Sequence, residues 1–499
     1  MVEPCFERLS AMDTSFLVLE KPWSPLHVSA TLIYEAGPLA KPDGGIDVDA
    51  YRAATEAVLD RIPRYRQKLA WIPIVSHPGW VDDPEFNLDY HVRHTSLPRP
   101  GSEEQLKKLA ARIMAQPLDH SKPLWEAWVV EGLEGGRFAV ISKIHHCMVD
   151  GMSGKDLAQI LHSTDPNERS RGAARPWSPR PAPSGSRLLA DEVGRYLTLP
   201  GRALRGLRGV STELGEAGQE LVLRARSIGQ MMSAMRSEPS KTPLNVPIGP
   251  HRRFDWRELS LADVRAVRKA LGCTINDLVL ATVTGAVRSF LAKRDHDVRG
   301  LDFRIAAPVS IRTQDDRGMG NRVSQWFVRA PVDEPDPLVR VARIQAATEE
   351  LKASKQALDA DLIMNIAEWT PTILLSLASR AASGSAPYNM MVTNVPGPQQ
   401  PLYLLGAKLL SLYSQVPIAD STALGVAIVS YSGKLCLGFN ADLESVPDLA
   451  AFADATCDAF LEIAAAAGVE VGRAPMGEIA PAKRAGRSRA PRTVRREKT

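Results

Sequence analysis

The sequence contains few cysteines and no stretch typical of a membrane span. Its five cysteines are odd in number and show no paired metal spacing, which favours a reduced, cytoplasmic compartment over a disulfide scaffold. The N-terminus carries Glu3, Glu7 and Arg8 among scattered apolar residues and is unlike a signal peptide, and no uncharged apolar window reaches the length of a membrane helix. Any membrane contact is therefore expected to be peripheral.

The usual motifs of covalent nucleophiles are also missing. The chain has no Gly-x-Ser-x-Gly elbow and no cysteine motif of a known nucleophile family. These absences favour a reaction in which one group is transferred directly, without a covalent intermediate on the protein.

A net positive charge is absent except at the C-terminal end. From Lys483 onward the chain holds eight lysines and arginines against the single acid Glu497, so the rest of the chain is slightly acidic. This composition cannot bury a core, and residues 472–499 are predicted to be a disordered, solvated tail. Attraction to anionic lipid is the alternative. Nucleic-acid binding is not expected, because no aromatic residue interrupts the run for base stacking.

The remaining sequence divides into two units. Residues 1–165 and 242–471 each alternate helical and strand-like patterns. Between them, closely spaced prolines around Trp177 predict a surface linker, followed by basic helices up to residue 241. These helices would bridge the units or lie on a membrane surface. The predicted fold class is α/β, with two domains of mixed sheets.

Local patterns predict several individual elements. Ser102 with Gln105 three residues later has the spacing of a capping box, and Ser260 and Thr274 are expected to cap two further helices. The pair Ser432-Gly433 predicts a hairpin turn. Alternating apolar residues predict strands over residues 86–92, 128–130, 138–144 and 304–310.

The main candidate for chemistry is the stretch from Lys143 to Gly151, which contains adjacent histidines at the end of a predicted strand. Successive side chains on a strand point to opposite faces, so one of His145 and His146 should pack while the other faces a cavity. A histidine there can act as a general base near neutral pH. His146 could take the proton from an alcohol, thiol or amine, which would then attack an acyl carbonyl. Asp150 and Gly151 predict a turn, with Asp150 securing the loop.

Two other interpretations of the histidine pair stay open. Metal binding by the His-His-Asp group is one, and it is disfavoured because the adjacent histidines point apart and no third ligand follows at helical spacing. A purely structural pair of buried histidines is the simpler alternative.

The pattern His-His-x-x-x-Asp-Gly, present as His145 to Gly151, resembles the active-site motif of the CoA-dependent acyltransferase superfamily, which includes chloramphenicol acetyltransferase and peptide-synthetase condensation domains. Other segments narrow this resemblance to the bacterial wax ester synthase/diacylglycerol acyltransferase family, across almost the whole chain except the basic tail. These segments are Leu9 to Asp13, His27-Val28, Pro123-Leu124-Trp125, Asn245 with Ile248-Gly249-Pro250, Asn276-Asp277, Pro308 to Arg312 and Asn394 to Pro398.

The resemblance implies a chloramphenicol acetyltransferase-like fold with a channel between two domains. It assigns the catalytic base to His146 and a largely structural role to Asp150. Acyl-CoA would meet diacylglycerol to give triacylglycerol, or a long-chain alcohol to give a wax ester, and no metal or prosthetic group is expected. The protein would be cytoplasmic or peripheral on the inner membrane or lipid droplets.

Further residues receive candidate roles from their chemistry. The negative charge that develops on the carbonyl oxygen needs a donor, and Asn276 and Ser310 are the polar candidates, although either could instead cap a helix or secure a turn. Arg312 could orient a loop carboxylate or contact CoA phosphate. Pro123, Leu124 and Trp125 could shape the acyl channel or simply pack, and Asn394 to Pro398 is interpreted as a rigid turn between the domains.

Two alternative functions remain at this point. The same fold could acylate another acceptor, such as a sugar, polyketide or amine. Alternatively, the chain could be a non-catalytic protein of lipid inclusions or membrane surfaces that uses its basic tail.

Overall fold

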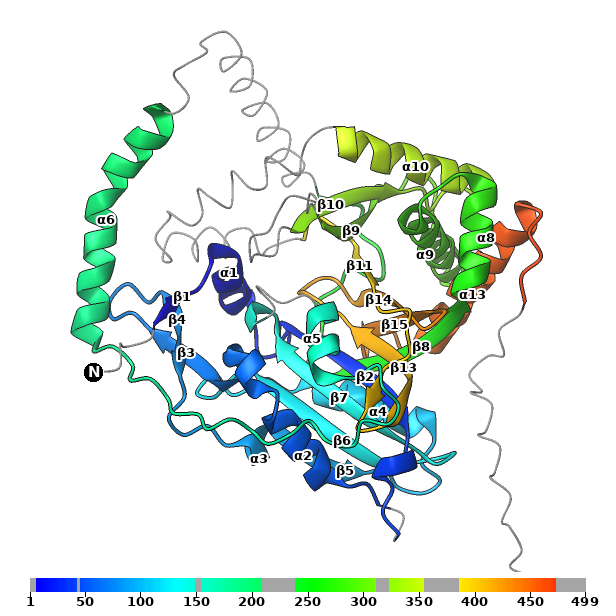
Figure 1. Cartoon of the computed structure of the whole chain (residues 1–499). Helices are drawn as coiled ribbons and strands as arrows, with labels where there is room; N and C mark the ends of the chain where they lie inside the picture. Colours follow the sequence, from blue (N-terminus) through cyan, green and yellow to red (C-terminus); the bar gives the residue numbers. More distant parts are fainter. Residues whose placement is uncertain are drawn as a thin grey trace, which may run out of the picture.

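The computed structural model describes residues 6–42, 45–148, 154–208, 238–310, 323–353 and 386–472. These residues form two six-stranded mixed sheets and one small three-stranded sheet (Figure 1). The small sheet has the order β1 (Glu7–Arg8), β4 (Pro78–Asp82) and β3 (Gln67–Trp71). The chain is therefore α/β, with two large sheets as expected from the sequence.

The N-terminal sheet holds the histidine strand near its centre. From edge to edge its strands are β12 (Tyr403–Leu404), β13 (Ala407–Gln415), β2 (His27–Glu35), β7 (Arg137–His145), β6 (Trp125–Leu133) and β5 (Val92–Ser96). Strands β2 and β7 are antiparallel, and His27 is the register partner of His145. The pairing therefore brings two imidazoles together from positions far apart in the sequence.

Helices and 3-10 turns of the N-terminal half surround this sheet. They are α1 (Ala11–Leu19), η1 (Gly37–Leu39), α2 (Val48–Glu56), η2 (Leu59–Arg61), η3 (Pro63–Arg66), α3 (Leu88–His91), α4 (Glu103–Ala115), η4 (His146–Met148) and α5 (Gly154–Leu161). Helix α1 packs against η4, the turn that follows the histidine strand.

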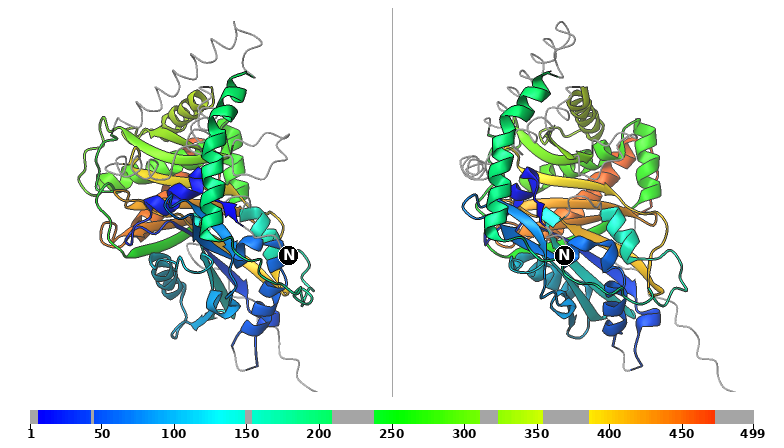
Figure 2. Two further views of the ribbon diagram at one scale, coloured as in Figure 1. Left: turned by 90° about the vertical axis from the view of Figure 1, so that its left-hand side faces the viewer. Right: turned by 60° about the vertical axis from the view of Figure 1, so that its left-hand side comes forward.

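The C-terminal sheet is covered by helices with strongly apolar faces. Its strand order is β10 (Val323–Ala330), β9 (Phe303–Ser310), β11 (Met390–Pro396), β14 (Leu424–Tyr431), β15 (Lys434–Asp442) and β8 (Arg252–Ser260), and its helices are α8 (Leu261–Leu271), α9 (Ile275–Ala292), α10 (Pro337–Ala353) and α13 (Leu449–Ala466). Phe452 of α13 packs edge-on against Phe290 of α9 and Phe439 of β15. In both views of Figure 2, helix α10 and the strands β5 to β7 lie at opposite ends of the molecule.

The two halves are joined by an exchanged segment. Strand β13 leaves the C-terminal half and pairs with β2 of the N-terminal sheet. In addition, α4 packs on β8, where the Lys107 ammonium lies 2.5 Å from the Asp255 carboxylate and the Trp256 ring stacks on Tyr413. Residues 242–471 therefore complete the sheet that carries the histidines.

Most elements that local patterns predict are confirmed. Helix α4 begins with a capping box between Ser102 and Gln105, and α8 and α9 begin at the predicted caps Ser260 and Thr274. The hairpin turns at Ser432-Gly433, and both residues have positive φ. These features depend on neighbours in the chain, so the sequence shows them directly.

Two local predictions are wrong. Residues 86–92 do not form a strand, because the Asn87 side chain accepts the Asp89 backbone N–H and starts the short helix α3. Strand β5 begins only at Val92. Asn394 to Pro396 do not form a turn between the domains, since they continue β11 in the middle of the C-terminal sheet and pair with β14. Only the residues after Pro396 leave the sheet.

The predicted linker has no regular secondary structure, but it is bonded to the N-terminal half. Residues 164–184 contain no helix or strand, and Arg180 bonds the Asp82 carboxylate through its backbone N–H and its guanidinium. Trp177 lies beside the Arg66 guanidinium and the Phe86 ring. The helix α6 (Gly185–Arg208) follows; the rest of the predicted bridging region, from 209 to 237, and the tail after 472 lie outside the described residues.

Candidate active site

The histidine turn is anchored on both sides by backbone hydrogen bonds. Strand β7 ends at His145, and residues 146–148 form the 3-10 turn η4. The His145 N–H donates to the Leu124 carbonyl at 3.0 Å, and the His146 N–H donates to the Leu26 carbonyl at 2.9 Å. The backbone position of His146 is therefore set by β6 on one side and β2 on the other.

The two histidines differ in their surroundings. His145 has no exposed side-chain surface, whereas His146 keeps partial solvent access. The His146 ring stacks on Phe16 of α1, with 3.9 Å between the ring centroids. One histidine is therefore packed and the other accessible, as the alternation of side chains on a strand predicts.

The local environment keeps the His146 imidazole neutral. Burial of the ring, with a smaller contribution from His145, lowers the pKa of His146 to about 4, against the opposing effect of a hydrogen bond to its own backbone carbonyl. His146 is thus equipped to accept a proton at neutral pH.

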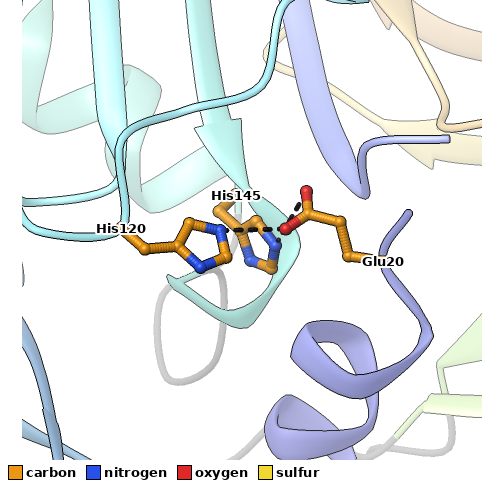
Figure 3. Close-up of side chains that lie close together, drawn as sticks. All are labelled: Glu20, His120 and His145. Carbon is orange, nitrogen blue, oxygen red and sulfur yellow. Dashed lines mark ion pairs between the residues drawn. The ribbon is translucent and has the colours of Figure 1, made fainter. Parts of the chain in front are cut away.

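His145 belongs to a cluster of three imidazoles, His27, His120 and His145, around the carboxylate of Glu20. Figure 3 shows Glu20 with His120 and His145. The Glu20 Oε1 atom lies 3.3 Å from His27 Nε2 and 3.4 Å from His145 Nε2, and its Oε2 atom lies 2.9 Å from His120 Nε2. Four segments of the N-terminal half therefore meet behind the catalytic turn.

The cluster is electrostatically balanced. Burial alone would raise the pKa of Glu20, but hydrogen bonds from His120, His145 and His27 hold it far below its usual range. The same carboxylate raises the pKa of His120, while burial lowers that of His27 to about 4. The imidazoles therefore favour the ionised form of Glu20, and Glu20 in turn favours the protonated form of His120.

The same group has the composition of a metal site. Glu20, His120 and His145 offer ligand atoms that lie within 4.8 Å of one another, and carboxylate and imidazole are ligands that zinc accepts. No third ligand follows the histidine pair at helical spacing in the sequence; this group is instead assembled from residues that the fold brings together.

Cys147 lies beside the histidines but is not suited to act as a nucleophile. Its Sγ atom lies 2.9 Å from His145 Nδ1, and burial raises the pKa of the thiol well above its usual value. Because the thiolate is the reactive form, this cysteine is expected to pack and to orient His145.

Pro123, Leu124 and Trp125 are all buried against the site. The Trp125 indole N–H donates to the Tyr65 carbonyl at 2.9 Å, and the Leu124 carbonyl is the acceptor that anchors His145. Of the two roles considered from the sequence, shaping the acyl channel or packing, these contacts support packing.

The candidates from the second half are only partly described. Asn276 lies in the first turn of α9 with a partly exposed side chain, and its neighbour Asp277 completes the helix cap and accepts a hydrogen bond from Thr348 at 2.7 Å. Ser310 is the last residue of β9. Arg312, Asp150 and Gly151 lie outside the described residues, and their roles stay predictions.

The sequence did not identify the residues that surround the histidine pair. His27 appeared only within a segment of the family resemblance, and Glu20, His120 and Phe16 were not singled out. The one local signal is a carboxylate directly after the apolar run Phe16 to Leu19. The pairing of β2 with β7 brings His27 and His145 together, and the loop before β6 adds His120.

Comparison with known proteins gives consistent matches over nearly the whole chain. Residues 9–279 match the wax ester synthase/diacylglycerol acyltransferase catalytic domain, and residues 319–464 match the C-terminal domain of the same family. A putative diacylglycerol O-acyltransferase of Mycobacterium tuberculosis is 33% identical over 468 residues, which cover 92% of this chain and 90% of that protein. The O-acyltransferase WSD of Acinetobacter baylyi is 30% identical, covering 88% and 93%.

Solved structures agree with this result. The wax ester synthase/diacylglycerol acyltransferase from Marinobacter aquaeolei VT8 is similar with a TM-score of 0.63 at 25% identity, covering 93% of this chain and 100% of that one. The first condensation domain of the CDA synthetase shares the fold, with a TM-score of 0.59 at 15% identity, covering 95% and 99%.

Proposed function

Because the chain belongs to the wax ester synthase/diacylglycerol acyltransferase family, we propose that it transfers a long-chain acyl group from acyl-CoA to the hydroxyl of diacylglycerol. The products would be triacylglycerol and free CoA. Long-chain alcohols are proposed as a second class of acceptor, giving wax esters. The observation that carries the mechanism is His146, an imidazole that burial keeps neutral at the end of a central strand.

The proposed reaction is a direct transfer. His146 Nε2 accepts the proton of the acceptor hydroxyl, and the hydroxyl oxygen attacks the thioester carbonyl carbon. The tetrahedral intermediate then breaks its carbon–sulfur bond, and the CoA sulfur leaves with the proton that His146 returns. Atoms and charge balance without an acyl-enzyme, which agrees with the raised pKa of the neighbouring Cys147 thiol.

No prosthetic group is needed for this sequence of steps. One imidazole moves the only proton, and acyl-CoA acts as a co-substrate. The negative charge on the intermediate would be stabilised by hydrogen-bond donors, for which Asn276 and Ser310 remain the proposed candidates from the second half.

The test is a direct assay of products. Purified protein is given labelled long-chain acyl-CoA with diacylglycerol or hexadecanol, and both CoA release and labelled ester are measured. Acylation of either acceptor is expected. A parallel series with a sugar, a polyketide alcohol and an amine addresses the related function, and acylation of one of these in place of both lipid acceptors would contradict the proposal.

We also propose that the protein works in the cytoplasm, in peripheral contact with the inner membrane or with lipid inclusions. Among the described residues one helix, α9, is long and apolar enough to cross a membrane, but 72% of it is buried inside the protein, as in a core helix. The exposed Leu19 and Trp23 side chains flank Glu20 and supply apolar surface near the site.

Flotation with vesicles of anionic lipid tests this contact. Part of the protein is expected to float with the vesicles and to be released at high salt. Complete retention in the lipid-free fraction would contradict it. Vesicle binding without any CoA release would instead favour a non-catalytic protein of lipid surfaces.

A further inference from the structure

The carboxylate of Glu20 occupies the centre of the imidazole cluster and has an additional backbone partner. Glu20 caps the C-terminal end of α1, where its N–H donates to the Phe16 carbonyl at 3.1 Å. Its Oε1 atom also accepts the Leu26 backbone N–H at 3.1 Å. One side chain therefore connects the end of α1, the start of β2, the loop before β6 and the end of β7.

The contacts determine which nitrogen of His145 carries the proton. The Cys147 backbone N–H donates to His145 Nδ1 at 3.2 Å, so Nδ1 must present a lone pair. The hydrogen of the neutral ring is then on Nε2, the atom that faces Glu20 Oε1 at 3.4 Å. His145 thus accepts a hydrogen bond from the turn at Nδ1, while its Nε2 faces the Glu20 carboxylate.

This tautomer connects Glu20 to the base. His145 Nδ1 holds the backbone of Cys147, the residue that follows His146 in the 3-10 turn. The Leu26 residue bonded by Glu20 supplies the carbonyl that holds the His146 N–H. Phe16, which stacks on the His146 ring, belongs to the helix that Glu20 ends. All three supports of His146 therefore meet at one carboxylate.

The same geometry argues against a metal ion in this cluster. A metal bound at His145 Nε2 would require the hydrogen to move to Nδ1. There it would face the hydrogen of the Cys147 N–H, which points at the same atom. The contact from the Cys147 N–H therefore fits a His145 ring that carries no metal at Nε2.

We propose that Glu20 is a positioning residue for the transfer reaction: its charge holds His145 as the Nε2–H tautomer and thereby orients His146. The role rests on the proposed function, because orientation of a base matters only if His146 acts as one. Glu20 does not touch the reacting atoms. Its loss should therefore lower kcat while leaving the KM for acyl-CoA and for the acceptor nearly unchanged.

Two substitutions separate charge from shape. Glu20→Gln keeps the shape and removes the charge, whereas Glu20→Asp keeps the charge on a shorter side chain. We expect kcat to fall about 10- to 100-fold in Glu20→Gln, with Glu20→Asp retaining more activity. Glu104→Gln is the matched control, because Glu104 is exposed on α4, and it should turn over like the wild type. A Glu20→Gln enzyme with wild-type kcat, or one more active than Glu20→Asp, would overturn the role of the charge.

A spectroscopic measurement decides the tautomer without depending on activity or on the folding of a Glu20 variant. In the wild-type protein, labelled with nitrogen-15 in its histidines, the His145 ring is assigned by its absence in His145→Asn. Nε2–H with an unprotonated Nδ1 supports the proposal, and Nδ1–H overturns it. Stoichiometric metal in the purified protein, lost on Glu20→Gln, would also overturn it. Failure of the proposed function would appear separately, as wild-type protein without turnover.

Discussion

The two halves of the molecule bury different kinds of side chain. Eight of the ten histidines lie between residues 27 and 162, and burial lowers the pKa of four of them to about 4. The C-terminal half has only His251 and His296. Its core instead consists of apolar contacts between α9, α13 and the sheet, such as Phe290, Phe439 and Phe452. Buried imidazoles are therefore concentrated in the N-terminal half, although both halves have an apolar core.

Substitutions in the two halves should therefore have different effects. Substitutions in the histidine cluster should change turnover or its pH dependence. Substitutions among the apolar helices should change the free energy of unfolding and leave the chemistry of the folded enzyme alone. Strand β13, which pairs with β2, makes the N-terminal sheet depend on the C-terminal half.

The largest expected effect is on catalysis. His146→Ala removes the proposed base and should lower kcat about 10²- to 10⁴-fold, with little change in the unfolding midpoint, as followed by CoA release and thermal unfolding. His94→Ala is the matched control, because His94 is partly exposed and lies 3.2 Å from the Glu131 carboxylate on the same sheet. Wild-type turnover in His146→Ala would refute the assignment of the base.

The next largest effect should fall on stability alone. Phe452→Ala removes a fully buried ring that contacts two other aromatic rings. It should lower the free energy of unfolding by about 3 to 5 kcal/mol, measured by urea denaturation, while the folded enzyme keeps its kcat within about twofold. The exposed Val339 provides the control Val339→Ala. A large loss of kcat in fully folded Phe452→Ala would remove the distinction between the halves.

Acid should weaken the N-terminal half first. The four histidines with lowered pKa are His27, His77, His146 and His162. Unfolded chains protonate histidine near pH 6.5 and the folded protein only near pH 4, so stability is lost as pH falls through this window. Each contributes at most about 1.4 kcal/mol per pH unit. His120, whose pKa is raised, acts in the opposite direction, because its contribution is lost as pH rises.

Hydrogen exchange locates this effect. At pH 5 the amides of β2 and β7 should lose protection relative to pH 7.5 by more than those of α9 and α13. Equal loss in both halves would show that the buried histidines do not control acid stability.

The smallest expected effect concerns the linker. Arg180→Ala removes the guanidinium bonds to Asp82, at 2.9 and 3.0 Å. Since Arg180 is largely exposed, the free energy of unfolding should fall by about 1 kcal/mol or less. Proteolysis between residues 164 and 184 should become faster, and kcat should not change. Arg175→Ala, at a highly exposed arginine paired with Asp60, is the control. A fall in kcat would mean that the linker contributes to the site.

The sequence was most informative where structure depends on neighbours in the chain. The caps at Ser102, Ser260 and Thr274 and the turn at Ser432-Gly433 were readable because the partner residues lie within three or four positions. The strand that ends at His145 was readable from its alternation and its turn. The predicted strand at 86–92 failed for a local reason too, since the helix start at Asn87 outweighed the alternating pattern.

Features that depend on pairing between distant segments could not be predicted from the sequence. Neither the strand order nor the transfer of β13 to the other sheet follows from periodicity. The cluster around Glu20 joins residues 20, 27, 120 and 145, and only the register of β2 with β7 brings His27 opposite His145. The sequence could therefore propose His146 as the base but not the carboxylate that supports it.

The central claim is that burial keeps His146 neutral so that it can act as the base. The most direct test is the pH dependence of kcat/KM for the wild-type enzyme, measured by pH jump from pH 7.5 so that turnover is recorded before acid unfolding. Because the base must be unprotonated, activity should remain level as pH falls through 6.5 and decline with an apparent pKa near 4. A decline near pH 6.5, or the same profile in the residual activity of His146→Ala, would contradict the claim.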